Sequence, residues 1–88
     1  MKTFADALNE NNVQAGVEEG QLFLVDDHDN VTEVGDFRVL QTNAGPDLRL
    51  GDDGLLSVCA VASSNVGDGG KWDIGAVHWA TFDGQRWA

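Results

Sequence analysis

A cysteine and a histidine form the first candidate for chemistry in this sequence. Cys59 lies in one apolar run and His78 in a second, and the glycine-rich stretch Gly67–Gly70 separates the two runs. An Asp-Gly pair at the centre of such a stretch is typical of a two-residue hairpin loop. A two-residue loop would place Cys59 directly opposite His78. A thiol beside an imidazole could act as an activated cysteine nucleophile.

The surroundings of this pair favour a structural role. Both residues lie in the middle of apolar strands, and the sequence offers no group that would orient the histidine or stabilise an oxyanion. A single cysteine cannot form an internal disulfide, which favours a reducing compartment and a buried, unreactive thiol. We therefore predict a protein that is not an enzyme and that has no catalytic residues.

The acidic cluster Asp26, Asp27 and Asp29 is the second candidate, because carboxylates at this spacing could bind calcium. The helix-loop-helix calcium template does not fit. With Asp26 at its first position, the glycine position falls on Val31 and the bidentate acid on Phe37. We predict a solvated turn here, and neither a metal nor a cofactor for the protein.

Charge is the most unusual property of the chain. Among 88 residues, five Lys and Arg stand against fifteen Asp and Glu, which gives a net charge of −10. Direct nucleic-acid binding is disfavoured, because such binding depends on cationic side chains that displace counterions from phosphates. An acidic surface can serve solubility, adaptation to high salt, or binding to a basic partner, and the sequence leaves these three open.

The pattern of apolar residues predicts one short helix at the N-terminus. Thr3 followed by Asp6 fits a capping box, and Phe4 and Leu8 lie on one stripe of a helix that runs to about Glu10. Because two helical turns are marginal in water, this helix must pack on an apolar surface.

The rest of the chain is typical of short antiparallel strands. We predict an α+β domain spanning 1–88, in which the short helix packs on a rolled antiparallel sheet of six or seven short strands. The expected strands are Val13–Val17, Gln21–Val25, Val31–Val34, Phe37–Gln41, Leu48–Leu50 and the two strands of a hairpin within Leu55–Trp87. The segment Thr42–Asp47 is expected to be a loop.

The C-terminal hairpin has two apolar faces, which is unusual for a hairpin with one side in water. The expected register groups large side chains on one face, which we predict to be the core beneath the helix: Trp72, Ile74, His78, Phe82 and Trp87. The other face, with Val77 and Trp79, would be either the second half of the rolled sheet or a docking surface.

Most acids fall in turns, so the sequence favours two acidic poles over one continuous strip. Glu18, Glu19 and Asp36 would gather at one end of the strands, and Asp26, Asp27 and Asp29 at the other. We predict that these six acids, together with Asp52, Asp53 and Trp79, bind a partner.

These features suggest a small acidic protein that inhibits or occupies a basic, nucleic-acid-handling protein or nucleoprotein complex. In size and charge the chain is similar to phage-encoded inhibitors of bacterial defence, including anti-CRISPR proteins and DNA mimics, although no motif assigns it to one family. One alternative is a structural or accessory subunit that self-associates, such as a minor virion or assembly protein, and another is an acidic halophile protein. With no signal core near Met1 and no run of ~20 apolar residues, we expect a cytoplasmic protein away from membranes.

Overall fold

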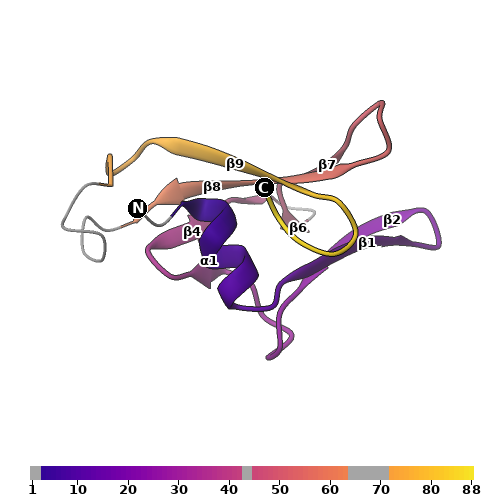
Figure 1. Cartoon of the computed structure of the whole chain (residues 1–88), viewed down its shortest axis with the longest axis horizontal. Coiled ribbons are helices and arrows are strands. Elements are labelled where there is room, and N and C mark those ends of the chain that lie inside the picture. The colour runs from indigo at the N-terminus through magenta and orange to yellow at the C-terminus, as the bar shows by residue number, and fades with distance from the viewer. Residues whose placement is uncertain (1–2, 43–44, 64–71) are drawn as a thin grey trace.

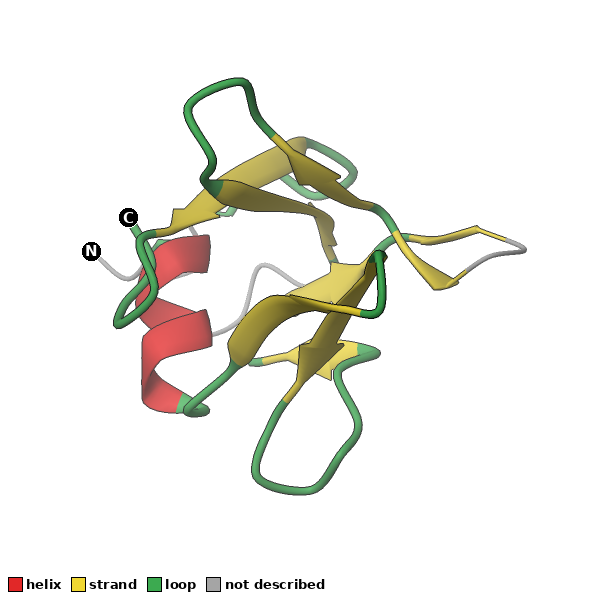
Figure 2. Cartoon of the chain, turned by 90° about the vertical axis from the view of Figure 1, so that its right-hand side faces the viewer, coloured by secondary structure: helices red, strands yellow, loops and turns green. Residues whose placement is uncertain are grey.

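The computed structural model describes residues 3–42, 45–63 and 72–88 of the chain. Within them lie one helix and a set of antiparallel strands, so the predicted α+β class is confirmed (Figures 1 and 2). The elements are α1 (Phe4–Glu10), β1 (Gln14–Glu18), β2 (Gln21–Val25), β3 (Glu33–Val34), β4 (Phe37–Val39), β5 (Gln41–Thr42), β6 (Gly45–Pro46), β7 (Leu48–Leu50), β8 (Leu56–Ala62) and β9 (Val77–Phe82).

Helix α1 begins with the capping box that the sequence predicts. The Thr3 hydroxyl accepts the Asp6 amide at 3.1 Å, and the Asp6 carboxylate accepts the Thr3 amide at 2.9 Å. These bonds satisfy donors that a helix start otherwise leaves free. Phe4, Ala7 and Leu8 are buried on the side that packs against the sheet, and β9 is the strand that the helix contacts most. Packing therefore stabilises a helix that would be marginal alone.

Strand β8 is the centre of the main sheet. Strand β9 pairs along one side of it, while β4 and β7 follow one another along the other side, and β3 extends the sheet beyond β4. Between β4 and β7 the chain leaves the sheet as the small β5–β6 hairpin and returns. The Asp47 amide donates to the Leu40 carbonyl at 3.0 Å and closes this excursion. The sequence predicted one strand at Phe37–Gln41 and a loop at Thr42–Asp47. In the structure the strand ends at Val39, and the short strands β5 and β6 lie where the end of the strand and the loop were predicted.

Strands β1 and β2 form a separate two-stranded sheet. Glu18 pairs with Gln21, so Glu19 and Gly20 alone form the turn, with φ of 51° and 79°. Positive φ at both positions is typical of the tight turn whose twist matches that of a hairpin. This hairpin projects from the body of the molecule beside the hairpin formed by β7 and β8 (Figure 1).

The register of β8 and β9 differs by one residue from the prediction. Cys59 lies opposite Trp79, and Ala60 lies opposite His78. The predicted turn Gly67–Gly70 lies outside the described residues. Because side chains alternate between faces, a shift of one residue moves every side chain of one strand to the opposite face.

The core lies between α1 and the inner face of the main sheet. On β8 this face carries Leu56, Val58, Ala60 and Ala62, and on β9 it carries Ala80 and Phe82. Trp72 and Trp87 are buried as predicted, whereas Ile74 is 57% exposed and does not belong to the core. In the residues described here, no helix is long and apolar enough to cross a membrane.

Candidate functional site

The structure separates Cys59 from His78. Cys59 belongs to the outward face of the main sheet, opposite Trp79, while His78 belongs to the inner face. Burial raises the pKa of the Cys59 thiol, which disfavours the thiolate form that a nucleophile needs. The predicted pairing of Cys59 with His78 is therefore wrong, because the register is shifted by one residue.

His78 packs among aromatic rings at one end of the inner face. Its ring centroid lies 5.1 Å from that of Phe37 and 6.3 Å from that of Trp72, and both pairs meet edge to face. Its Nε2 atom is buried and has no hydrogen-bond partner among the described residues. Within this part of the chain the histidine acts as a packing side chain.

The acidic turn that connects β2 to β3 is held together by the Asp26 carboxylate. The Asp26 Oδ1 atom accepts the amides of His28 and Asn30, both at 2.8 Å, and the Asn30 bond is the main reason why the Asp26 pKa is lowered. Asp27 accepts the Asn12 side-chain amide at 2.9 Å, and Asp29 has a positive φ of 57°. In the described ranges, no group of three His, Cys, Asp or Glu side chains is placed to hold a metal ion.

A similar turn carboxylate gives the fold a measurable pH dependence. Asp83 accepts the amides of Arg86 and Gln85, at 2.9 and 2.8 Å, and these bonds lower its pKa. Its stabilising effect is complete above the ordinary value of 3.8 and is lost as the pH falls through the lowered pKa. Asp83→Asn keeps the accepting oxygen but removes this titration. We expect the free energy of unfolding of the variant, measured in urea at decreasing pH, to fall less steeply in acid; an equally steep fall would contradict this role.

Asp36 also has a structural role, and it lies away from Glu18 and Glu19, with which the sequence analysis groups it. Its carboxylate accepts the Trp72 indole N–H at 3.1 Å, and its carbonyl accepts the Ser63 amide at 2.9 Å. These contacts place it beside the C-terminal end of β8. Glu18 and Glu19 lie at the tip of the β1–β2 hairpin. Figure 1 shows this tip at the opposite end of the molecule from the C-terminal end of β8, so the predicted pole containing all three acids is wrong.

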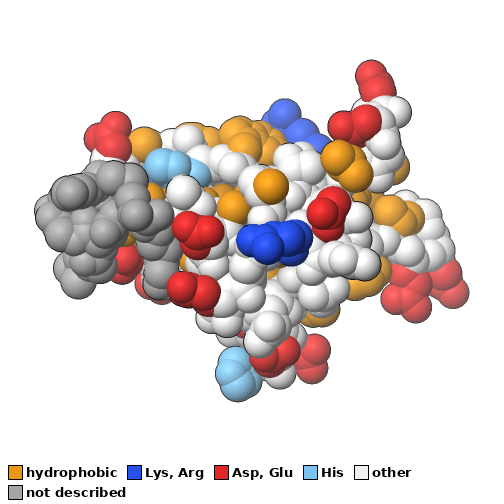
Figure 3. All heavy atoms as spheres, viewed as in Figure 1, with side chains coloured by type: hydrophobic (Ala, Val, Ile, Leu, Met, Phe, Trp, Pro, Cys, Tyr) orange, Lys and Arg blue, Asp and Glu red, His pale blue; other side chains and the backbone are white. Residues whose placement is uncertain are grey.

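The structure instead brings Glu18 and Glu19 to the same end of the molecule as Asp52 and Asp53. The first two occupy the tip of the β1–β2 hairpin, and the second two occupy the turn between β7 and β8. The two hairpins project side by side, and Figure 3 shows acidic side chains on both projections. We call this region the two-hairpin end. In the described part of the chain, the side chains of Glu18, Glu19 and Asp52 make no hydrogen bond or ion pair, so they are available to a partner.

Exposed apolar side chains lie between these acidic tips. On β1 and β2, the cross-strand pair of Ala15 and Leu24 packs against the core. The pair of Val17 and Leu22 lies on the same face, two residues nearer the tip. On β7 the inner face continues in the same way to Leu50. Val17 and Leu50 are 51% and 53% exposed. The core surface thus extends past the body of the domain to the two tips.

These apolar residues are the part of the site that reading the sequence missed. In the sequence analysis they are placed in strands, with no predicted extension of those strands beyond the core. The alternation of large apolar residues up to the Glu19-Gly20 turn, through Val17 and Leu22, was a signal that could have found them. In a hairpin that ends at the core boundary, polar residues would replace them at the tip.

The remaining predicted residue, Trp79, lies on the outward face of the main sheet and is 44% exposed. The Arg49 guanidinium lies 4.8 Å from the centre of its ring, a cation–π contact, and Arg49 also approaches Asp47 at 3.6 Å. Trp79 therefore lies on the outward face, whereas the apolar side chains between the two acidic tips continue the inner face.

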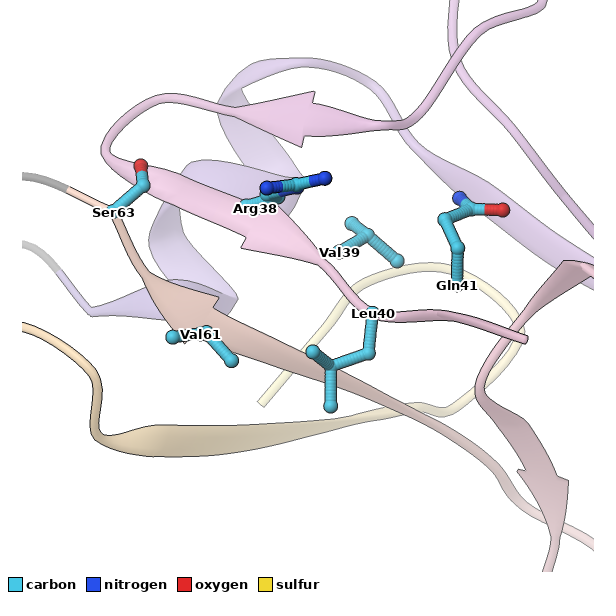
Figure 4. Close-up of a pocket in the computed structure, with 6 residues that line it drawn as sticks. All are labelled: Arg38, Val39, Leu40, Gln41, Val61 and Ser63. Atoms are coloured by element: carbon cyan, nitrogen blue, oxygen red, sulfur yellow. The ribbon is translucent and has the colours of Figure 1, made fainter.

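An open hollow of about 470 Å³ lies on the same face. Arg38, Val39, Leu40, Gln41, Val61 and Ser63 line it. Figure 4 shows Leu40 and Val61 on one side of the hollow and Arg38 and Gln41 on the other. Among the described residues that line it, Arg38 alone is charged, and the side chains of Gln41 and Ser63 add neutral polar groups that could orient a ligand.

Comparison with known protein families, with curated proteins and with solved structures gives no match for this chain.

Proposed function

We propose that this protein is a non-enzymatic binding protein whose two-hairpin end occupies a basic, nucleic-acid-handling protein. The observation that carries the proposal is the combination of four carboxylates at two neighbouring tips with exposed apolar side chains between them. A surface of this kind suits a partner segment in which an apolar side chain is flanked by lysines or arginines. The carboxylates would speed encounter and select positive charge, while the apolar contact would supply most of the affinity.

The charge of this surface supports a partner that handles nucleic acid. Proteins that bind phosphates present clustered lysine and arginine, and those clusters attract the acidic end of this protein in the same way. Binding there would block access of nucleic acid to the partner, which is how a small acidic protein would inhibit it. We include in this proposal the kind of biological system in which such inhibition would be used, for example a phage that counters a bacterial defence complex.

The test is a pair of variants with equal charge. In the first, Glu18→Gln, Glu19→Gln, Asp52→Asn and Asp53→Asn neutralise the two-hairpin end. In the second, four exposed acids elsewhere are neutralised: Asp27→Asn, Asp29→Asn, Glu33→Gln and Asp73→Asn. Both variants have a net charge of −6, because four negative charges are removed from −10.

Each protein is used to capture partners from a nuclease-treated bacterial extract at low and at high salt. We expect the natural chain and the second variant to retain the same basic protein at low salt. The affinity of the first variant for that protein should be lower by about ten-fold or more, equivalent to about 1.4 kcal/mol. The purified partner should bind nucleic acid, and the natural chain should compete with that binding. Equal losses in both variants would show that only total charge matters, and would contradict a site at the two-hairpin end.

A further inference from the structure

Strand β9 has one edge that is only partly covered. One edge of the strand pairs with β8. On the other edge, Thr81 exchanges two hydrogen bonds of 2.9 Å with Ala88. In an antiparallel sheet, the N–H and C=O groups of alternate residues point to the same edge. Those of Val77 and Trp79 therefore point outward with those of Thr81. Nothing in the described chain pairs with these four groups.

This edge lacks the features by which proteins protect an exposed strand. The segment Val77–Phe82 contains no charged residue and no proline, either of which would discourage another strand from pairing. Val77 and Trp79 are 56% and 44% exposed, and both are residue types that favour strands. Both the backbone and the side chains of this window can therefore receive an added strand.

The distribution of charge indicates what that strand would be. By register, the outward face of the main sheet carries Glu33 and Arg38 in one row, and Arg49 on β7. Asp47, which precedes β7, lies 3.6 Å from the Arg49 side chain. These four charges sum to zero, and the outward positions of β8 and β9 add none, on a chain whose net charge is −10. A basic partner would be drawn to the acidic two-hairpin end instead. A second copy, itself acidic, can approach closely only where the surface is neutral.

We propose that two copies of this chain join edge to edge through residues 77–79 of β9, antiparallel and about a two-fold axis. Val77 and Trp79 of each copy donate and accept main-chain hydrogen bonds with the other copy. Their side chains merge into one apolar patch on the outward face, as aromatic and β-branched residues do across neighbouring strands. Ala88 occupies the edge beside Thr81 and confines the contact to this short window.

The first measurement is sedimentation equilibrium of the full chain over a range of concentrations in about 1 M NaCl, where charge repulsion is screened within about 3 Å. We expect the mass to rise from the 9.4 kDa of one chain toward twice that value. Val77→Lys should weaken the association by about ten-fold or more, because lysine is a typical protector of exposed edges. Val17→Lys is the matched control, since Val17 is 51% exposed on β1, and it should leave the association unchanged.

Amide hydrogen exchange then separates pairing of edges from stacking of faces. The amides of Val77 and Trp79 should exchange quickly in dilute solution and at least several-fold more slowly at concentrations where the dimer forms. Those of His78 and Ala80 point toward β8 and should be slow throughout. A chain that stays at 9.4 kDa at every concentration would overturn the proposal. So would a dimer in which the Val77 and Trp79 amides exchange as quickly as before.

Discussion

Replacing Trp87 by alanine is expected to lower the free energy of unfolding by about 3–5 kcal/mol, the range for deleting a large buried aromatic side chain. Trp87 is 1% exposed, and its ring centroid lies 4.9 Å from that of Phe82. Its indole N–H donates to the Val13 carbonyl at 3.0 Å, and its backbone exchanges two hydrogen bonds with the Asn9 side chain. The substitution leaves a cavity and removes the donor to the Val13 carbonyl, whereas the two backbone bonds to Asn9 remain possible. Urea denaturation followed by circular dichroism measures the loss.

Trp79→Ala is the matched control for this prediction. The same side chain is removed, but from a 44% exposed position where its described polar contact is the stacked Arg49. We expect a loss of about 1 kcal/mol or less, the range of an exposed cation–π contact. Equal losses for the two variants would contradict the core described above.

A comparable loss, also about 3–5 kcal/mol, is expected for Phe37→Ala. Phe37 is fully buried, and its ring contacts those of Phe4, Trp72 and His78 with centroids 5.1, 4.6 and 5.1 Å away. These three contacts join it to the helix, to the segment preceding β9 and to β9 itself. Removing it opens a cavity that its rigid aromatic neighbours cannot fill.

Phe23→Ala provides the comparison for Phe37, because Phe23 is 38% exposed on β2 and lies over Gly16. We expect its replacement to cost less than half as much in the same denaturation experiment. In addition, near-ultraviolet circular dichroism should lose the aromatic signal of the core in Phe37→Ala and keep it in Phe23→Ala. A signal that survives in Phe37→Ala would mean that the core repacks without it.

Local signals in the sequence predicted the helix, the β1–β2 hairpin and β7 well. The Thr3 and Asp6 capping box depends on residues three apart, and the Glu19-Gly20 turn depends on two neighbours. Such features form from the chain nearby and need no knowledge of the rest of the fold.

The register of β8 and β9 could not be predicted in this way. In most hairpins one polar face fixes the register, but β8 is apolar on both faces, so a shift of one residue leaves an equally apolar pattern. The Asp-Gly pair is then the remaining local signal for the register. Near the start of β9, Ala62 bonds to both Gly75 and Ala76, and the sequence gives no sign of this irregular pairing.

The acidic site was predictable in its residue types but not in its grouping. Turn acids at Glu18, Glu19, Asp52 and Asp53 were each visible in the sequence, yet their proximity depends on how a separate two-stranded sheet packs beside β7. That packing is set by contacts between residues far apart in the chain, which spacing along the sequence does not encode.

The two ends of the β5–β6 excursion are held together by hydrogen bonds, and this bears on where the chain can accept an insertion. The bond from Asp47 to Leu40 brings the two ends of the excursion together, and Cys59 bonds to both residues from β8, through its carbonyl to Leu40 and its amide to Asp47. The pairing of β4 and β7 with β8 therefore does not depend on the residues inside the excursion. Because lengthening a loop adds only a slowly growing entropic cost, this is the natural position at which to graft a foreign peptide or a label while preserving the rest of the domain.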